Sequence, residues 1–328
     1  PRATVVVPAH NRPAAISETV AALLPAASVA GAEVVVVDDG SRPPLALDAR
    51  AGLRIIRTEG IERSRARNAG AVAARGARLL FVDDDITVRP DFVVHHLAGA
   101  AEFGDVITVG RISLPAEWTK SPFGRFRRLI EDPGQDRPRG FVGETNFCTA
   151  ANMSIDRSRF LALGGFDPAI LSAEDQDLAL RFCETGGRIA YLPEADVVHQ
   201  DGVADMAAYG RRHEWGARAM APFLRRYADR LENRHRAALA APLIQLPPGQ
   251  WPGRLARLFL AREPALRLVE AGLAALERLS VSDDVRFRCY RGLLGLRLFR
   301  GFRQGLATVR NAPTLPTSIP LARPDGAE

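Results

Sequence analysis

The chain has 328 residues, 47% hydrophobic and 25% charged, which is typical of a globular protein of about two domains and excludes disordered, collagen-like and disulfide-scaffold chains. Its 44 lysines and arginines outnumber 38 acidic residues, giving a net charge of +6, and Lys120 is the only lysine. This positive charge is compatible with binding phosphates, nucleic acid or an anionic membrane, and composition does not distinguish these three partners. The three widely spaced cysteines indicate neither a disulfide framework nor a zinc site, so a reducing compartment is expected.

The first half of the chain alternates short β-branched runs with helix-like segments. Strands are predicted at residues 4–7, 33–37, 53–56, 78–82 and 106–109. Helices are predicted at residues 13–30, 65–75 and 90–102. This alternation predicts an α/β domain with a mostly parallel sheet. No run reaches the roughly 18 uninterrupted apolar residues of a membrane span.

Polar residues follow the ends of three predicted strands. Residues 8–12 read Pro-Ala-His-Asn-Arg, residues 38–41 read Asp-Asp-Gly-Ser, and residues 83–85 are three aspartates. Open α/β sheets bind ligands beyond the carboxyl ends of their strands, so a site is expected there. The first loop lacks the GxGxxG pattern of dinucleotide-binding proteins, and the chain has no Walker phosphate loop.

Two of these segments have alternative interpretations. Three adjacent carboxylates repel one another, and a divalent cation bound through oxygen would relieve the repulsion; otherwise one of them caps a helix and the others are solvated. Side chains alternate in an extended segment, so Asp83 and Asp85 are expected to face one way and Asp84 another. Residues 38–41 form either a simple turn or a carboxylate acceptor for a nucleobase imide or a ribose hydroxyl.

Acidic residues and a histidine in the second half also have two interpretations. A helix is predicted at residues 174–184, where the helix dipole favours Glu174 and Asp175 in the first turn, although a carboxylate facing the sheet edge would also serve as a general base. The i,i+4 pair of Asp177 and Arg181 indicates a structural ion pair. His199 is either structural or, with a metal on the aspartates, a further ligand.

The C-terminal third is predicted to be helical and rich in arginine. Segments 253–262, 264–279 and 286–306 combine apolar and basic residues at helical spacing, and residues 311–328 form a proline-rich tail. These helices either pack on the rest of the chain or form a homodimer, or they lie on an anionic bilayer. Stretch 120–140 reads as a basic loop bordering the acceptor side.

Taken together, the chain resembles the family 2 glycosyltransferases, which use nucleotide sugars and have the GT-A fold. The resemblance covers about residues 3–202. It rests on a set of sequence segments that occur in this order along the chain, at 5–12, 36–41, 66–70, 80–85, 151–153, 164–167 and 174–178. It implies a catalytic domain at 1–203, with a nucleotide-binding half at 1–115 and an acceptor half at 116–203. A helical region at 204–310 follows, before the tail.

The resemblance also implies the site residues. The nucleotide sugar would be bound by Pro8, His10, Asn11, Arg12, Asp39, Arg63, Asn68, Asp83 and Asp84. Arg65 is an alternative to Arg63, and His10 departs from the small or hydroxyl residue that is commoner in the family. Asn152 and Glu174 would lie beside the donor sugar and the acceptor. Asp83, Asp85 and His199 would hold Mn²⁺ or Mg²⁺, and Asp175 would be the catalytic base.

The implied reaction is inverting transfer of a sugar from a nucleotide-diphosphate donor, with a UDP-sugar favoured, to a hydroxyl of a glycan, a lipid carrier or a small molecule. Two alternatives are a metal-dependent nucleotidyltransferase and a non-catalytic scaffold that binds a sugar nucleotide or a glycan. No nucleic-acid partner is expected, because no groove-reading motif is present. The expected location is the cytoplasm, with peripheral contact on the inner face of the cell membrane left open.

Overall fold

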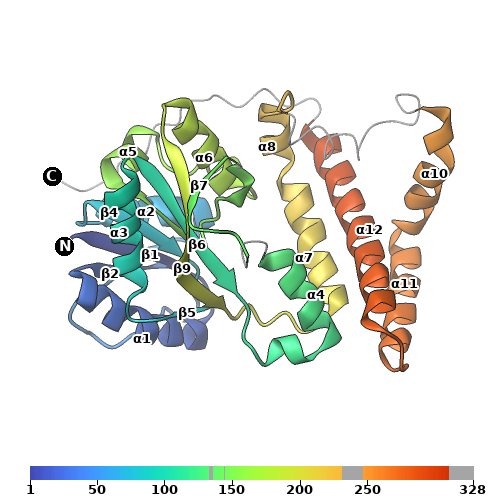
Figure 1. Ribbon diagram of the computed structural model, residues 1–328, viewed down its shortest axis with the longest axis horizontal. Coiled ribbons are helices and arrows are strands. Elements are labelled where there is room, and N and C mark those ends of the chain that lie inside the picture. Colours follow the sequence, from blue (N-terminus) through green and yellow to red (C-terminus); the bar gives the residue numbers. More distant parts are fainter. Residues whose placement is uncertain (133–135, 144, 231–246, 310–328) are drawn as a thin grey trace.

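The computed structural model describes residues 1–132, 136–143, 145–230 and 247–309. A nine-stranded sheet with helices on both faces forms one end of the molecule, and a group of long helices forms the other (Figure 1). The predicted α/β class, followed by a helical C-terminal region, is confirmed.

The N-terminal half builds the parallel part of the sheet. Four strands lie side by side in the order β3 (Leu53–Thr58), β2 (Glu33–Asp39), β1 (Ala3–Ala9) and β4 (Arg78–Val82). Helix α1 (Pro13–Ala30) connects β1 to β2 and α2 (Arg63–Ala73) connects β3 to β4, while α3 (Phe92–Phe103) follows these strands and leads to the rest of the sheet. Because these four strands are parallel, their carboxyl ends meet at one edge of the sheet.

Beyond β4 the sheet becomes mixed. β8 (Asn152–Asp156) runs antiparallel between β4 and β6 (Val106–Ser113), and β9 (Arg188–His199) runs parallel to β6. The short strands β5 (Ile86–Val88) and β7 (Gly140–Val142) pair antiparallel with β9. A bulge in β6 follows Gly110, where a Cβ would come within 1.9 Å of the Ala195 carbonyl oxygen, so only glycine fits there.

Each face of the sheet buries its own apolar core. Alternate residues of β1 point to opposite faces, with Val5 and Val7 packing toward α1 and α3 and Val6 toward α2. The second face is also covered by α5 (Arg157–Ala162) and α6 (Glu174–Glu184). Among the described helices, α1 alone has the length and apolar composition to cross a membrane, and here it packs on the sheet as a core helix.

The prediction of a basic loop at 120–140 is wrong for the first half of that stretch. After the short turn η1 (Trp118–Lys120), residues Pro122–Glu131 form helix α4. The Ser121 hydroxyl caps this helix by accepting from the Gly124 amide at 2.9 Å, and Pro122 occupies the first helical position. The prolines that suggested a loop therefore include one that starts a helix.

The C-terminal helices form a group that two apolar clusters join to the sheet end of the molecule. They are α7 (Met206–Ala219), α8 (Ala221–Arg226), α10 (Trp251–Leu260), α11 (Glu263–Glu277) and α12 (Asp283–Val309), with short turns η2 (Thr145–Phe147) and η4 (Pro248–Gln250) elsewhere. One apolar cluster joins α4 to α7, α11 and α12, and another joins α6 to α7, α8 and α12. The predicted helical segments are confirmed. The tail at 311–328 lies outside the described residues, and the boundary at residue 203 stays a prediction.

A buried ion-pair cluster fastens α8 to α6. Arg226 donates to Asp177 at 2.6 Å and to Asp167 at 2.5 Å, and its side chain is only 3% exposed. Asp177 also forms the expected pair with Arg181 at 2.9 Å. Removing one member of such a cluster leaves a buried charge without compensation.

We expect Arg226→Met to lower the free energy of unfolding by about 3 kcal/mol, because Asp167 and Asp177 would stay buried without this cation. Arg230→Met is the matched control, since its pair with Glu184 is about half exposed and should change the stability by less than about 1 kcal/mol. Urea unfolding of both variants measures the difference. Equal losses would show that burial of the Arg226 pair is unimportant.

Candidate active site

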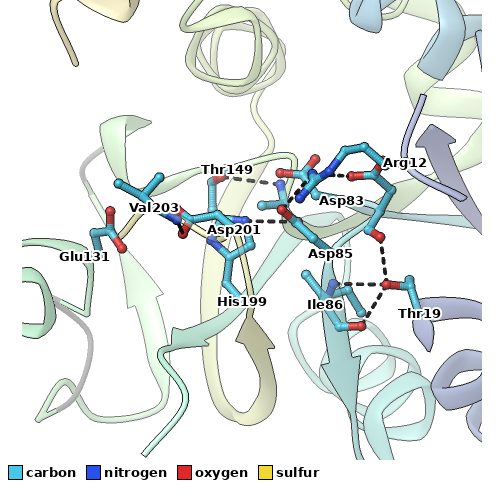
Figure 2. Close-up of polar contacts among 12 residues, drawn as sticks. Arg12, Thr19, Asp83, Asp85, Ile86, Glu131, Thr149, His199, Asp201 and Val203 are labelled. Carbon is cyan, nitrogen blue, oxygen red and sulfur yellow. Dashed lines mark hydrogen bonds and ion pairs between the residues drawn. The ribbon is translucent and has the colours of Figure 1, made fainter. Parts of the chain in front are cut away.

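Three aspartates follow β4 at the edge where the parallel strands end. The Thr19 hydroxyl from α1 contacts the Asp84 and Ile86 carbonyl oxygens at 2.9 Å and accepts from the Ile86 amide at 3.1 Å, which holds this loop against the helix (Figure 2). Arg12, at the start of α1, donates to both Asp84 and Asp85 at 2.8 Å. Burial and the neighbouring carboxylates raise the pKa of Asp84 to about 6.

His199 at the end of β9 faces the same loop (Figure 2). One ligand atom each from Asp83, Asp85 and His199 lie within 4.8 Å of one another. The buried Oδ1 of Asp85 lies 3.1 Å from Nε2 of His199, at ion-pair distance. Apart from this contact it has no partner among the described residues. Two carboxylates and an imidazole suit Mn²⁺, and their oxygens suit Mg²⁺. The residues present therefore fit a divalent cation.

Arg67 on α2 links this loop to α6. Its side chain is 2% exposed and donates to Asp83 at 2.6 Å and to Glu174 at 2.9 Å. Although burial raises the pKa of Asp83, the charges of Arg67, Arg63 and His199 outweigh it and lower that pKa. Sequence reasoning assigned no role to Arg67. The available signal was its i,i+4 spacing from Arg63, which places both side chains on one face of the helix.

Arg63 and Arg65 take different positions. Both are exposed, but Arg63 lies 3.6 Å from Glu174 and lines two cavities, whereas Arg65 lines neither. A role of Arg63 toward a nucleotide stays a prediction.

Asp175 lies in the first turn of α6. Its Oδ2 accepts from the Ala150 amide at 3.0 Å, and its Oδ1 accepts from the Gln176 amide at 2.8 Å. Burial, with a further contribution from the adjacent Glu174, raises the pKa of Asp175 to about 6. A carboxylate with such a pKa is ionised near neutral pH and still accepts a proton readily.

Two cavities meet at these residues. The larger, of about 700 Å³, is lined by Pro8, His10, Arg12, Asp39, Asp84, Asp85 and neighbouring residues. The smaller, of about 420 Å³, is lined by Glu174, Asp175, Arg111, Tyr191, Ile130 and neighbouring residues. Both are lined by Arg63, Asp83, His199 and Arg212. The acidic loop after β4 therefore stands at the junction between the two spaces.

Asp39 and His10, which line the larger cavity, are fixed by backbone contacts. Asp39 accepts from the amides of Ile61 at 2.7 Å and Glu62 at 3.1 Å, which orders the loop before α2. His10 lies 2.6 Å from the Asp39 carbonyl oxygen through Nδ1, so the unusual histidine is held against the end of β2.

Three predicted site residues do not line either cavity. Asn11 has a left-handed φ of 54° and accepts from the Arg42 amide at 2.7 Å. Asn68 exchanges two hydrogen bonds with the Phe166 backbone, at 2.8 and 2.9 Å. Asn152 is fully buried between β6 and β9, where it donates to the Arg111 and Ala195 carbonyl oxygens. These contacts position the loops around the site.

Two further lining residues were not anticipated. Asp201, which follows β9, accepts from Arg127 at 2.8 and 3.0 Å and also pairs with Arg212 of α7. Arg212 lines both cavities, and its side chain is 48% exposed. The helical region therefore contributes a cation to the site. Arg212 had no local sequence signal, because nothing in α7 indicates which of its arginines faces the sheet edge.

The chain is similar in sequence to proteins of one family. The sequence profile of glycosyl transferase family 2 matches residues 4–161. The pre-mycofactocin glycosyltransferase of Mycobacterium tuberculosis is 28% identical over 285 residues, covering 82% of this chain and 57% of that relative, so the chain spans little more than half its length. The succinoglycan biosynthesis protein ExoO of Rhizobium meliloti is 31% identical over 247 residues, covering 70% of this chain and 69% of ExoO. S. aureus TarS 1–349 aligns with a TM-score of 0.47 at 16% identity, covering 95% and 92% of the two chains.

The mixed sheet with its flanking helices and the matching family profile place the chain in the class of proteins with the GT-A fold. Within that class, the chain belongs to glycosyltransferase family 2.

Proposed function

We propose that this protein transfers a sugar, with inversion at the anomeric carbon, from a nucleotide-diphosphate donor to a hydroxyl of a glycan, a lipid carrier or a small molecule. The observation that carries the proposal is the meeting of two cavities at Asp83 and His199. The donor would occupy the larger cavity, and the acceptor would reach the junction through the smaller one, where Asp175 lies.

A UDP-sugar is the favoured donor. Asp39 lines the larger cavity with a carboxylate that already orients the loop at residues 58–62. Its Oδ2 accepts one hydrogen bond among the described residues, from Glu62, and so keeps capacity to accept from a uracil imide. Arg63 and Arg212, which border both cavities, would face the negative charge of the diphosphate.

A divalent cation, Mn²⁺ or Mg²⁺, would be held by Asp83, Asp85 and His199 and would offset the charge that develops on the leaving diphosphate. Asp175 would accept the proton of the acceptor hydroxyl while the oxygen of that hydroxyl bonds to the anomeric carbon. The bond from that carbon to the phosphate oxygen breaks at the same time, and its electron pair leaves with the nucleoside diphosphate. Attack from the side opposite the leaving group inverts the configuration.

We expect the protein to release UDP from one member of a panel of UDP-sugars when Mn²⁺ is present. A coupled assay for free UDP, run with and without Mn²⁺, measures this. Release of pyrophosphate from a nucleoside triphosphate and a sugar phosphate would instead indicate a nucleotidyltransferase. Binding of the sugar nucleotide without any turnover would indicate a scaffold.

Replacing Asp175 tests the assigned base. Asp175→Asn keeps the size of the side chain and one acceptor for the amides of Ala150 and Gln176, and it removes the basic carboxylate. We expect transfer to fall at least about a hundredfold, while UDP affinity stays within about threefold. Glu184→Gln, which removes an exposed carboxylate from the other end of α6, is the matched control. Normal turnover by Asp175→Asn would remove Asp175 from this role.

The pH dependence of wild-type activity tests the role of Asp175 independently of the substitution. Because the pKa of Asp175 is raised to about 6, its carboxyl group is protonated below that pH and cannot accept a proton. The value of kcat/KM should therefore rise with pH through about 6 and level off above it. This ascending limb should be absent from any residual activity of Asp175→Asn.

The cation site is tested by binding alone. Asp85→Asn removes the charge of one expected ligand, so Mn²⁺ affinity should fall at least about tenfold. Asp91→Asn is the control, because Asp91 is half exposed and pairs with His95 outside both cavities. Calorimetric titration of each protein with MnCl₂ measures the affinities. Unchanged affinity in Asp85→Asn would contradict the proposed site.

A further inference from the structure

The outer side of α10 and α11 carries exposed apolar and basic residues that the proposed reaction does not use. Figure 1 shows these two helices on the side of α12 that faces away from the sheet. Arg254 of α10 turns toward α12, with its guanidinium carbon 5.0 Å from the centre of the Phe299 ring. This contact sets the rotation of α10 and leaves its other side open.

Three large apolar residues form a line along that open side. Trp251, Leu255 and Phe259 are spaced four residues apart, which places them on one stripe of the helix. Their exposed fractions are 41%, 52% and 61%, and Leu268 on α11 is 75% exposed. A line of exposed large apolar side chains along one helix, such as these three on α10, is typical of an interaction site.

The charges on this surface have one sign. α10 contains no acidic residue, and the three glutamates of α11 all contact α12. Glu270 accepts from Arg297 at 2.7 Å, Glu277 accepts from the Tyr290 hydroxyl at 2.8 Å, and Glu263 pairs with Arg300.

Two arginines flank the apolar residues. Arg262 is exposed, and its guanidinium carbon lies 5.8 Å from the centre of the Phe259 ring. Arg267 is 77% exposed and keeps a 3.6 Å contact with Glu263. The open side therefore presents guanidinium groups together with apolar side chains.

We propose that this surface, formed by Trp251, Leu255 and Phe259 with Arg262, binds an anionic lipid bilayer. The apolar side chains would enter the boundary between headgroups and acyl chains, and the arginine would pair with a lipid phosphate. A second copy of this chain is a less suitable partner for this surface. A two-fold contact through this face would bring Arg262 near its own counterpart, with the α11 glutamates already turned toward α12.

Binding to this surface would hold the protein on the inner face of the cell membrane as a peripheral protein. It requires no donor, metal or catalytic residue, so it is tested separately from sugar transfer.

The experiment is co-sedimentation of the full chain with vesicles of phosphatidylcholine alone or with about 30% phosphatidylglycerol. We expect binding to the anionic vesicles only, weakened by high salt. Leu255→Ser with Phe259→Ser should lower the partition coefficient at least about tenfold. Val29→Ser on α1, at a site 67% exposed, is the matched control and should bind as the wild type does.

The contribution of arginine is tested by Arg262→Gln, which should lower binding to anionic vesicles about fivefold. Arg50→Gln, at a site 53% exposed, is the control. The urea unfolding midpoints of all these variants should equal that of the wild type, which verifies their folding.

Three results would overturn the proposal. They are equal binding to both kinds of vesicle, equal loss in the Val29→Ser control, and a dimer in light scattering without lipid that Leu255→Ser with Phe259→Ser dissociates. The last result would assign the surface to a second copy of this chain.

Discussion

Crowding of negative charge at one edge of the sheet is the constraint on which the rest of the site depends. Asp83, Asp84 and Asp85 follow β4, and the start of α6 brings Glu174 and Asp175 beside them. Arg67 compensates Asp83 and Glu174, and Arg12 compensates Asp84 and Asp85. The pKa values of these carboxylates differ as a result. Despite burial, Arg67 and Arg63 lower the pKa of Asp83, whereas burial and Glu174 raise that of Asp175. Such a division suits one group to stay ionised and another to accept a proton.

Buried arginines also hold the molecule together away from the site. Arg226 joins α8 to two aspartates, Arg127 joins α4 to Asp201, and Arg297 joins α12 to Glu214 and Glu270. A guanidinium donates in several directions at once, which a lysine ammonium does less well at a planar bridging site. Part of the basic excess in the composition therefore serves internal ion pairs, and a separate part lies beside the open side of α10.

The sequence predicted the N-terminal half closely, because each local signal there agrees with the sheet. Continuous valines in β1 and β2 reflect burial on both faces, and Pro13 marks the start of α1. Alternation placed Asp83 and Asp85 together. α4 was missed because prolines and arginines in an amphipathic helix resemble a loop when its apolar partners are distant in sequence. Asn68 and Asn152 were assigned to the ligand, although their amides are engaged by backbone groups far along the chain.

By itself the sequence determined the α/β class, the strand ends that carry the acidic residues and the family, because strand period, helix starts and strand-end motifs are local properties. Only the tertiary structure decided which charges meet. Arg67 contacts Glu174 across 107 positions, and His199 reaches Asp85 from another strand. Arg212 enters the site from a helix that the sequence assigned to a separate region. Side chains this far apart are brought within ion-pair distance by strand order and helix packing, which no local pattern encodes.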